Sequence, residues 1–65
     1  MKFFMINEND YYDKEDYFYP LLINVSHIIY FDILGDFVRI YFTDDYQIEV
    51  TIDCYNSLLA FIQSI

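Results

Sequence analysis

The sequence predicts an α+β fold, an antiparallel β-meander of three to five strands with one C-terminal helix packed on one face. Three observations support this class. From Leu21 onward, β-branched and aromatic residues form short runs that are separated by turn signals. Residues 53–65 carry apolar side chains at helical spacing. A chain of 65 residues has room for one domain only.

This single domain, residues 1–65, has two parts. Residues 1–20 contain a short apolar run at Phe3–Ile6, which is a candidate first strand, and then the acidic, aromatic stretch NENDYYDKEDYFYP. Residues 21–65 hold the meander and the helix. We expect strands in the four runs LLINV, HIIYFDI, FVRIYFT and YQIEVTI, and a helix in DCYNSLLAFIQSI.

The first turn of the meander fixes the register of two strands. In Leu34-Gly35-Asp36-Phe37, a glycine at the first central position is typical of a two-residue type II′ hairpin loop. Counting back from this loop places apolar residues together on one face and polar or aromatic residues on the other. The expected pairs are Ile33 with Val38, Phe31 with Ile40, Ile29 with Phe42, Asp32 with Arg39, and Tyr30 with Tyr41.

The second turn must have an odd number of residues. Val38, Ile40 and Phe42 have to share a face with Ile48, Val50 and Ile52, and a two-residue loop would separate the two sets. A loop of three residues, 43–45, satisfies the alternation, since Asp tolerates a left-handed conformation. It places Glu49 opposite Arg39, which then lies between Asp32 and Glu49.

The C-terminal helix is expected to close the core. Asp53 is a candidate N-cap, and the apolar stripe that follows it consists of Tyr55, Leu58, Leu59, Ile62 and Ile65. We expect this stripe to cover the apolar face of the meander, formed by Ile29, Phe31, Ile33, Val38, Ile40, Phe42, Ile48, Val50 and Ile52.

The second face of the meander carries Ile28, Tyr30, Leu34, Phe37 and Tyr41 around the Asp32, Arg39 and Glu49 ladder, more apolar area than a free monomer usually exposes. One interpretation is that the tyrosine-rich N-terminal segment folds over it. The other is that Tyr30, Phe37 and Tyr41 form a homodimer or partner interface.

Charge restricts the class of partner. Eleven acidic residues against three Lys and Arg give a net charge of −8, which repels nucleic acid and anionic membrane surfaces and attracts a basic protein. The apolar run after Lys2 is too short for a secretory signal, and no stretch is long and apolar enough to span a bilayer. With a single, unpaired Cys54, we expect a soluble cytoplasmic protein.

No motif for catalysis, cofactor or metal stands out, and we expect none of the three. Cys54 falls in the first turn of the expected helix, where the helix dipole lowers a thiol pKa, and His27 begins a strand. Nothing supplies an orienting group or an oxyanion site for this pair, so structural roles are favoured. The oxygen-rich run from Asn7 to Asp16 lacks the central glycine of an EF-hand loop.

The acidic and aromatic residues favour charge mimicry, because carboxylates can replace phosphates on Arg and Lys while tyrosine rings stack on guanidinium groups. The alternative is a charged rim that only keeps the domain soluble. The candidate partner contacts are Glu8, Asp10, Tyr11, Tyr12, Asp13, Glu15, Asp16, Asp36, Asp44 and Asp45.

This small, acidic chain, rich in Tyr and Phe and with the stretch NENDYYDKEDYFYP, resembles the inhibitors that phages and other mobile elements use against host defence, including anti-CRISPR proteins and DNA mimics. The resemblance implies a phage-encoded protein in the host cytoplasm that blocks the nucleic-acid-binding surface of a defence effector. The residue pattern of INVSHII, RIYFT and IEV is also similar to that of small flagellar-operon proteins. This second resemblance concerns residues with structural roles and implies no functional site. A homodimeric interaction subunit without nucleic-acid mimicry is the alternative function.

Overall fold

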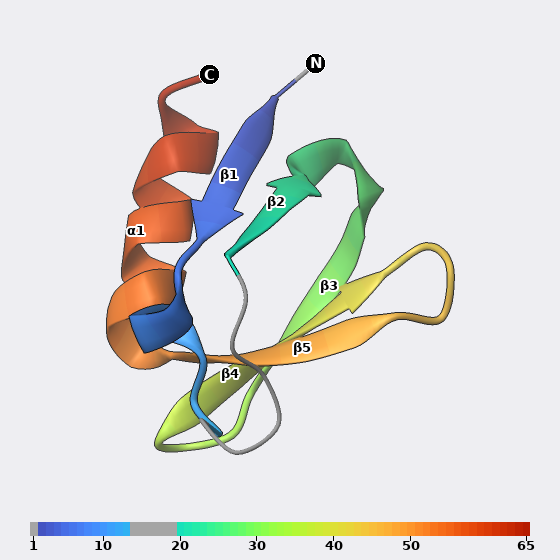
Figure 1. The fold of residues 1–65 in the computed structure, drawn as a ribbon. Helices are drawn as coiled ribbons and strands as arrows, with labels where there is room; N and C mark the ends of the chain where they lie inside the picture. The colour runs from blue at the N-terminus through green and yellow to red at the C-terminus, as the bar shows by residue number, and fades with distance from the viewer. Residues whose placement is uncertain (1, 14–19) are drawn as a thin grey trace.

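The computed structural model describes residues 2–13 and 20–65, and it confirms the α+β class (Figure 1). In these ranges three strands form a meander and one helix follows it. The elements in chain order are β1 (Phe3–Ile6), the 3-10 turn η1 (Glu8–Asp10), β2 (Leu21–Asn24), the 3-10 turn η2 (Val25–His27), β3 (Ile28–Ile33), β4 (Phe37–Phe42), β5 (Gln47–Thr51) and α1 (Ile52–Gln63).

The strands form two separate antiparallel sheets. One has the order β3-β4-β5, and the other pairs β1 with β2. Figure 1 shows α1 and the β1-β2 ribbon on the same side of the larger sheet, with both chain ends at the top of the view. The strand expected in LLINV therefore exists but does not extend the meander. Asn24 caps η2 by accepting a hydrogen bond from the Ser26 amide at 3.1 Å, and this turn separates β2 from β3.

The β3-β4 hairpin has the predicted register from Ile33 to Tyr30. The Leu34 amide donates to the Phe37 carbonyl at 2.9 Å, and Gly35 has a φ of +83°, as the first position of the predicted loop requires. Beyond Tyr30 a β-bulge changes the pairing, so that Ile28 and not Ile29 opposes Phe42. The predicted place of Ile29 in the core is wrong: its side chain is 57% exposed, whereas Ile28 packs against the core.

The β4-β5 hairpin confirms the three-residue loop at 43–45. The Phe42 amide donates to the Tyr46 carbonyl at 2.8 Å, and Asp45 adopts the left-handed conformation with a φ of 62°. Arg39 therefore opposes Glu49 on one side and Asp32 on the other, as predicted. The ion pair of Arg39 is with Glu49.

Helix α1 begins two residues earlier than expected. Thr51, not Asp53, is the N-cap, because its hydroxyl accepts the Cys54 amide hydrogen bond at 3.1 Å. Ile52 consequently lies in the first turn of the helix and not in the sheet. At the other end, Ile65 follows the helix and is exposed, so it does not belong to the buried stripe.

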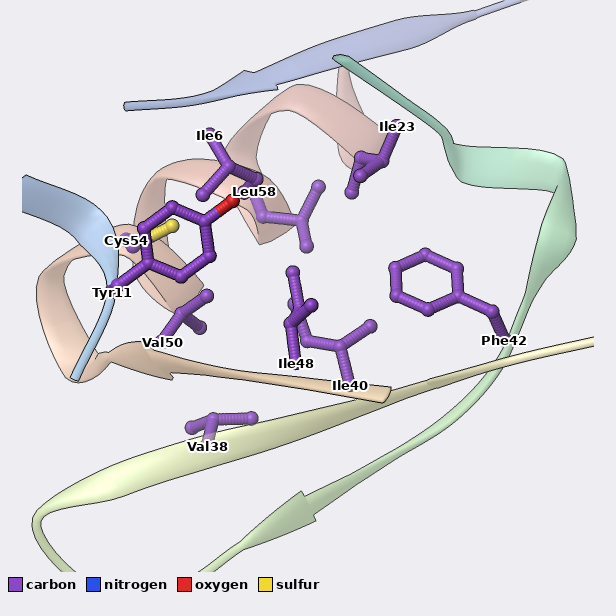
Figure 2. Packing of buried hydrophobic residues seen from close by; sticks show 10 residues of the cluster. All are labelled: Ile6, Tyr11, Ile23, Val38, Ile40, Phe42, Ile48, Val50, Cys54 and Leu58. Carbon is purple, nitrogen blue, oxygen red and sulfur yellow. The ribbon is translucent and has the colours of Figure 1, made fainter. Parts of the chain in front are cut away.

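The core lies between the larger sheet and the layer formed by α1 and the small sheet (Figure 2). Val38, Ile40 and Val50 are fully buried in the larger sheet, and Ile6 and Leu58 meet them from β1 and α1. A tilted pair of rings, Phe4 and Phe61, packs β1 against the helix at 5.5 Å. Ile33, which we expected in this core, is exposed at the end of β3. The complete buried set is Ile6, Tyr11, Ile23, Val38, Ile40, Phe42, Ile48, Val50, Cys54 and Leu58.

Candidate protein-binding surface

The beginning of the acidic, aromatic stretch is attached to the free edge of β5. Tyr11 forms an antiparallel bridge with Val50, and the Tyr12 amide donates to the Glu49 carbonyl at 3.0 Å. Because successive side chains of an extended segment point to opposite faces, Tyr11 enters the core and Tyr12 does not. Tyr11 is only 3% exposed, so its predicted role as a partner contact is wrong for this conformation.

Tyr12 joins an aromatic and charged surface on the side of the meander away from α1. We call it the outer face and define it as Tyr12, Tyr30, Phe37, Arg39, Tyr41 and Glu49. The rings of Tyr12 and Phe37 stack with centroids 4.4 Å apart, and those of Tyr30 and Tyr41 stack at the same distance. The interpretation that the N-terminal segment folds over this face holds in part, because Tyr12 covers Phe37 while Tyr30 stays 54% exposed.

Arg39 lies between the two stacked pairs and fixes their arrangement. Its Nε and Nη2 donate to Glu49 Oε2 at 3.0 and 2.7 Å, and its Nη1 donates to the Tyr41 hydroxyl at 3.3 Å. Its guanidinium carbon is 6.0 Å from the Phe37 ring centroid. The hydrogen bonds to Tyr41 and Glu49 raise the pKa of Arg39 above its ordinary value. The cation is thus engaged within the chain, and the rings around it are preorganised.

Carboxylates border this face where β5 meets α1. Asp13 follows Tyr12, and Asp36 precedes Phe37, so the stacked rings bring these two acidic residues to one end of the molecule. Asp10 is close enough to Cys54 to act on its thiol electrostatically, which places η1 near the first turn of α1, the turn that also contains Asp53. We call this region the acidic end and define it as Glu8, Asp10, Asp13, Asp36 and Asp53.

Part of this acidity has a structural role. Asp10 Oδ2 accepts the Asn7 amide hydrogen bond at 2.8 Å and so holds the η1 turn. Asp53 lies in the first turn of α1, where a negative charge interacts favourably with the helix dipole. Glu8 and Asp36 are exposed members of the acidic end to which no such structural role is assigned.

The other predicted contacts do not join this group. Asp44 and Asp45 are exposed in the β4-β5 turn, at the opposite end of the meander from the β3-β4 turn that holds Asp36. Glu15 and Asp16 lie outside the described residues. The structure thus unites Glu8, Asp10, Tyr12, Asp13 and Asp36 and separates Asp44 and Asp45 from them. Sequence reasoning missed Asp53 because only the tertiary fold brings the helix start beside η1.

The structure places Cys54 in α1 and His27 in η2. Burial and, to a smaller extent, the charge of Asp10 raise the pKa of the Cys54 thiol to about 12, so the expected lowering by the helix dipole is wrong. His27 is not at the start of a strand but in η2, where it lines a pocket of about 180 Å³ with β2, Phe42, Asp44 and Tyr46. Among the described residues, no group of three or more His, Cys, Asp or Glu is arranged to hold a metal ion.

Comparison with protein-family models, with curated proteins and with solved structures finds no match for this chain. Its class is therefore defined by its own fold and surface: a small α+β domain with a preorganised aromatic face beside an acidic end. Within residues 2–13 and 20–65, no helix has the length and apolar character that crossing a membrane would demand.

Proposed function

We propose that this protein is a small acidic inhibitor that binds a basic, nucleic-acid-binding surface of another protein through its outer face and its acidic end. The observation that carries the proposal is the pair of aromatic stacks held around Arg39 beside the acidic end. A host defence protein such as a CRISPR effector is the class of target, and an anti-CRISPR or DNA-mimic inhibitor encoded by a phage and acting in the host cytoplasm is the class of protein.

Charge supports a basic protein as the partner. The net charge of −8 opposes direct binding to nucleic acid and to anionic membranes and accelerates encounter with a positive groove. Arg39 is held by Glu49 within the outer face. Glu8 and Asp36, which are exposed, can replace phosphates as acceptors for the partner's Arg and Lys.

The aromatic stacks supply the anchoring part of the proposed interface. Exposed tyrosines that are already fixed lose little conformational entropy on binding, and they offer ring faces to guanidinium groups. Tyr12 and Tyr30 are the exposed members of the two stacks and are therefore the proposed anchors. No cofactor, metal or reaction enters this mechanism, in which the protein acts by occupying a surface.

Displacement of a labelled DNA duplex from a purified CRISPR effector tests the proposal, with two variants that remove equal charge. We expect Glu8→Gln with Asp36→Asn to weaken displacement roughly fivefold, since two interfacial ion pairs of on the order of 0.5 kcal/mol each sum to about 1 kcal/mol. Asp44→Asn with Asp45→Asn changes the net charge equally at the opposite end and should have little effect. If both variants lose displacement equally, the acidic end contributes only through net charge and not through specific contacts. If the wild type displaces no DNA, CRISPR effectors are not the target class.

The alternative function is a homodimeric interaction subunit that uses Tyr30, Phe37 and Tyr41. The exposure of Tyr30 on the edge strand β3 favours it, because an aromatic side chain on an open sheet edge suits an interface. Full activity of a variant with all carboxylates of residues 8–16 neutralised would support this alternative over the inhibitor.

A further inference from the structure

A pocket of about 180 Å³ lies between the small sheet and the β4-β5 turn. Strand β2 forms one wall, and the other walls contain His27, Phe42, Asp44 and Tyr46. The β4-β5 turn is at the opposite end of the meander from the β3-β4 turn, which holds Asp36. The described residues that line the pocket include none of those that define the outer face or the acidic end. The pocket is therefore a second candidate site, which the inhibitor proposal does not use.

Hydrogen bonds hold the walls of this pocket in place. The Thr43 amide donates to the His27 carbonyl at 3.0 Å and so ties η2 to the β4-β5 turn. Asn24 Oδ1 accepts from the amide and from the hydroxyl of Ser26, at 3.1 and 2.6 Å, and fixes the start of η2. A ligand would thus meet a largely preformed site, as is usual for pockets that bind small molecules.

Two aromatic rings and a carboxylate give the pocket its chemical character. The rings of Phe42 and Tyr46 are neighbours, with centroids 5.7 Å apart and planes tilted by 38°. The backbone hydrogen bond from the Phe42 amide to the Tyr46 carbonyl, at 2.8 Å, keeps the two residues together. Among the described lining residues, Asp44 is the one acidic residue and none is Lys or Arg. On a chain with a net charge of −8, such a pocket favours a cation over an anion.

The type of cation follows from the hydrogen bonds that it would need. A primary ammonium group has three N–H donors and a guanidinium group five, and a donor that loses water without finding an acceptor costs free energy. The pocket offers one carboxylate among mainly apolar and aromatic walls. A quaternary ammonium group has no N–H donor, its methyl groups suit apolar walls, and ring faces attract it within about 6 Å of their centroids.

We propose that this pocket binds a small, free quaternary ammonium compound of the choline type, with its trimethylammonium group against Phe42 and Tyr46 and beside the Asp44 carboxylate. The pocket volume is several times the roughly 30 Å³ that one water molecule occupies in the liquid, which leaves room for this group. A free compound is favoured over a phosphocholine headgroup, because the phosphate would lie near the negative charges of Asp44 and Asp45.

Titration of the isotope-labelled protein with choline chloride, followed by NMR, tests the inference. We expect saturating shifts that are centred on the amides of Asn24, His27 and Asp44. The matched probe is dimethylbutanol, the neutral analogue in which carbon replaces the nitrogen of choline, and it should bind roughly tenfold more weakly because it lacks the charge. Sodium chloride at the same concentrations is the blank, and phosphocholine should bind more weakly than choline.

Three variants locate the site. Asp44→Asn should lower the affinity for choline about fivefold, because it removes the carboxylate beside the cation. Asp32→Asn removes equal charge in β3, outside the described lining of the pocket, and should keep the affinity of the wild type. Tyr46→Leu keeps an apolar wall without the ring and should reduce the advantage of choline over its neutral analogue about threefold. The spectrum of each variant verifies that it is folded.

Equal affinity for choline and its neutral analogue would overturn the inference, and so would shifts that do not saturate or that lie outside the pocket. Equal losses in Asp44→Asn and Asp32→Asn would also overturn it, because net charge alone would then explain the binding. Tighter binding of phosphocholine than of choline would overturn the choice of a free compound. Each of these failures leaves the inhibitor proposal intact, because that proposal uses the outer face and the acidic end.

Discussion

Tyr11 and Cys54 show how a residue type can suggest one role while its surroundings give it another. Both belong to the buried cluster between β5, β1 and α1. Tyr11 shares its acidic sequence neighbourhood with Tyr12, but the alternation of an extended segment buries one ring and exposes the next. Cys54 lies in the first turn of a helix, a position that lowers the pKa of a reactive thiol, but its burial raises the pKa.

The thiol makes stability depend on pH in the alkaline range. The unfolded chain loses the Cys54 proton near the ordinary value of 9.0, whereas the folded chain keeps it until its pKa of about 12. Between these values the unfolded state binds fewer protons, so the free energy of unfolding falls as pH rises, by about 1.4 kcal/mol per pH unit from this group.

Urea titrations at several pH values from neutral to strongly alkaline measure this dependence. Tyrosines and lysines titrate in the same range, so the variant Cys54→Ala is the reference, and the difference in slope between the two proteins belongs to the thiol. Equal slopes in wild type and variant would contradict the raised pKa. Slow reaction of the native thiol with a maleimide is the matching kinetic expectation.

The N-cap of α1 gives a second prediction at the residue scale. Thr51→Ala removes the hydroxyl that accepts the Cys54 amide hydrogen bond, and we expect a loss of about 1 kcal/mol in the free energy of unfolding. Asp53→Ala removes only a charge near the helix start and should cost about half as much. The urea midpoints of the two variants measure these losses of stability. A larger loss for Asp53→Ala than for Thr51→Ala would identify Asp53 as the N-cap.

Among the elements, the two hairpins were the most predictable part of the fold. Turn chemistry at Gly35 and side-chain alternation across Val38–Phe42 are independent signals, and each fixes the same register. The bulge at Ile29 was not predictable, because Ile28 and Ile29 are both apolar and either one satisfies the pattern. The pairing of β2 with β1 also needed the tertiary structure, since the two strands are separated by residues 7–20.

The same limit applies to the candidate surface. Sequence reasoning found Tyr30, Phe37 and Tyr41 on one face and the Arg39 to Glu49 register, since these follow from the hairpins. It did not find that Tyr12 stacks on Phe37 or that η1 approaches the helix start, because no local pattern links these segments.

The β3-β4 loop supplies a prediction at the scale of elements. Gly35 has a φ of +83°, a conformation that costs a residue with a Cβ about 1–2 kcal/mol. No atom lies within 4 Å of the place that a Cβ would occupy, so the cost of Gly35→Ala is conformational and not steric. Asp36→Ala, one residue later, should change stability by less than about 0.5 kcal/mol. If the two variants unfold at the same urea concentration, the type II′ loop is contradicted.

For the whole molecule, the two edges of the larger sheet have different character. The β5 edge carries Tyr11 and Tyr12 and leads to the acidic end, whereas the β3 edge is apolar and open.

The most direct test of the proposed function is the salt dependence of direct binding to a CRISPR effector free of nucleic acid, measured with wild type and Tyr12→Ala. We predict that the affinity of the wild type falls at least tenfold from low to high ionic strength, and that Tyr12→Ala lowers the affinity at every salt concentration. Phe3→Ala, which removes an exposed ring on β1, is the control and should behave as the wild type. Binding that is indifferent to salt and to the loss of the Tyr12 ring would contradict a mechanism based on the acidic end and the outer face.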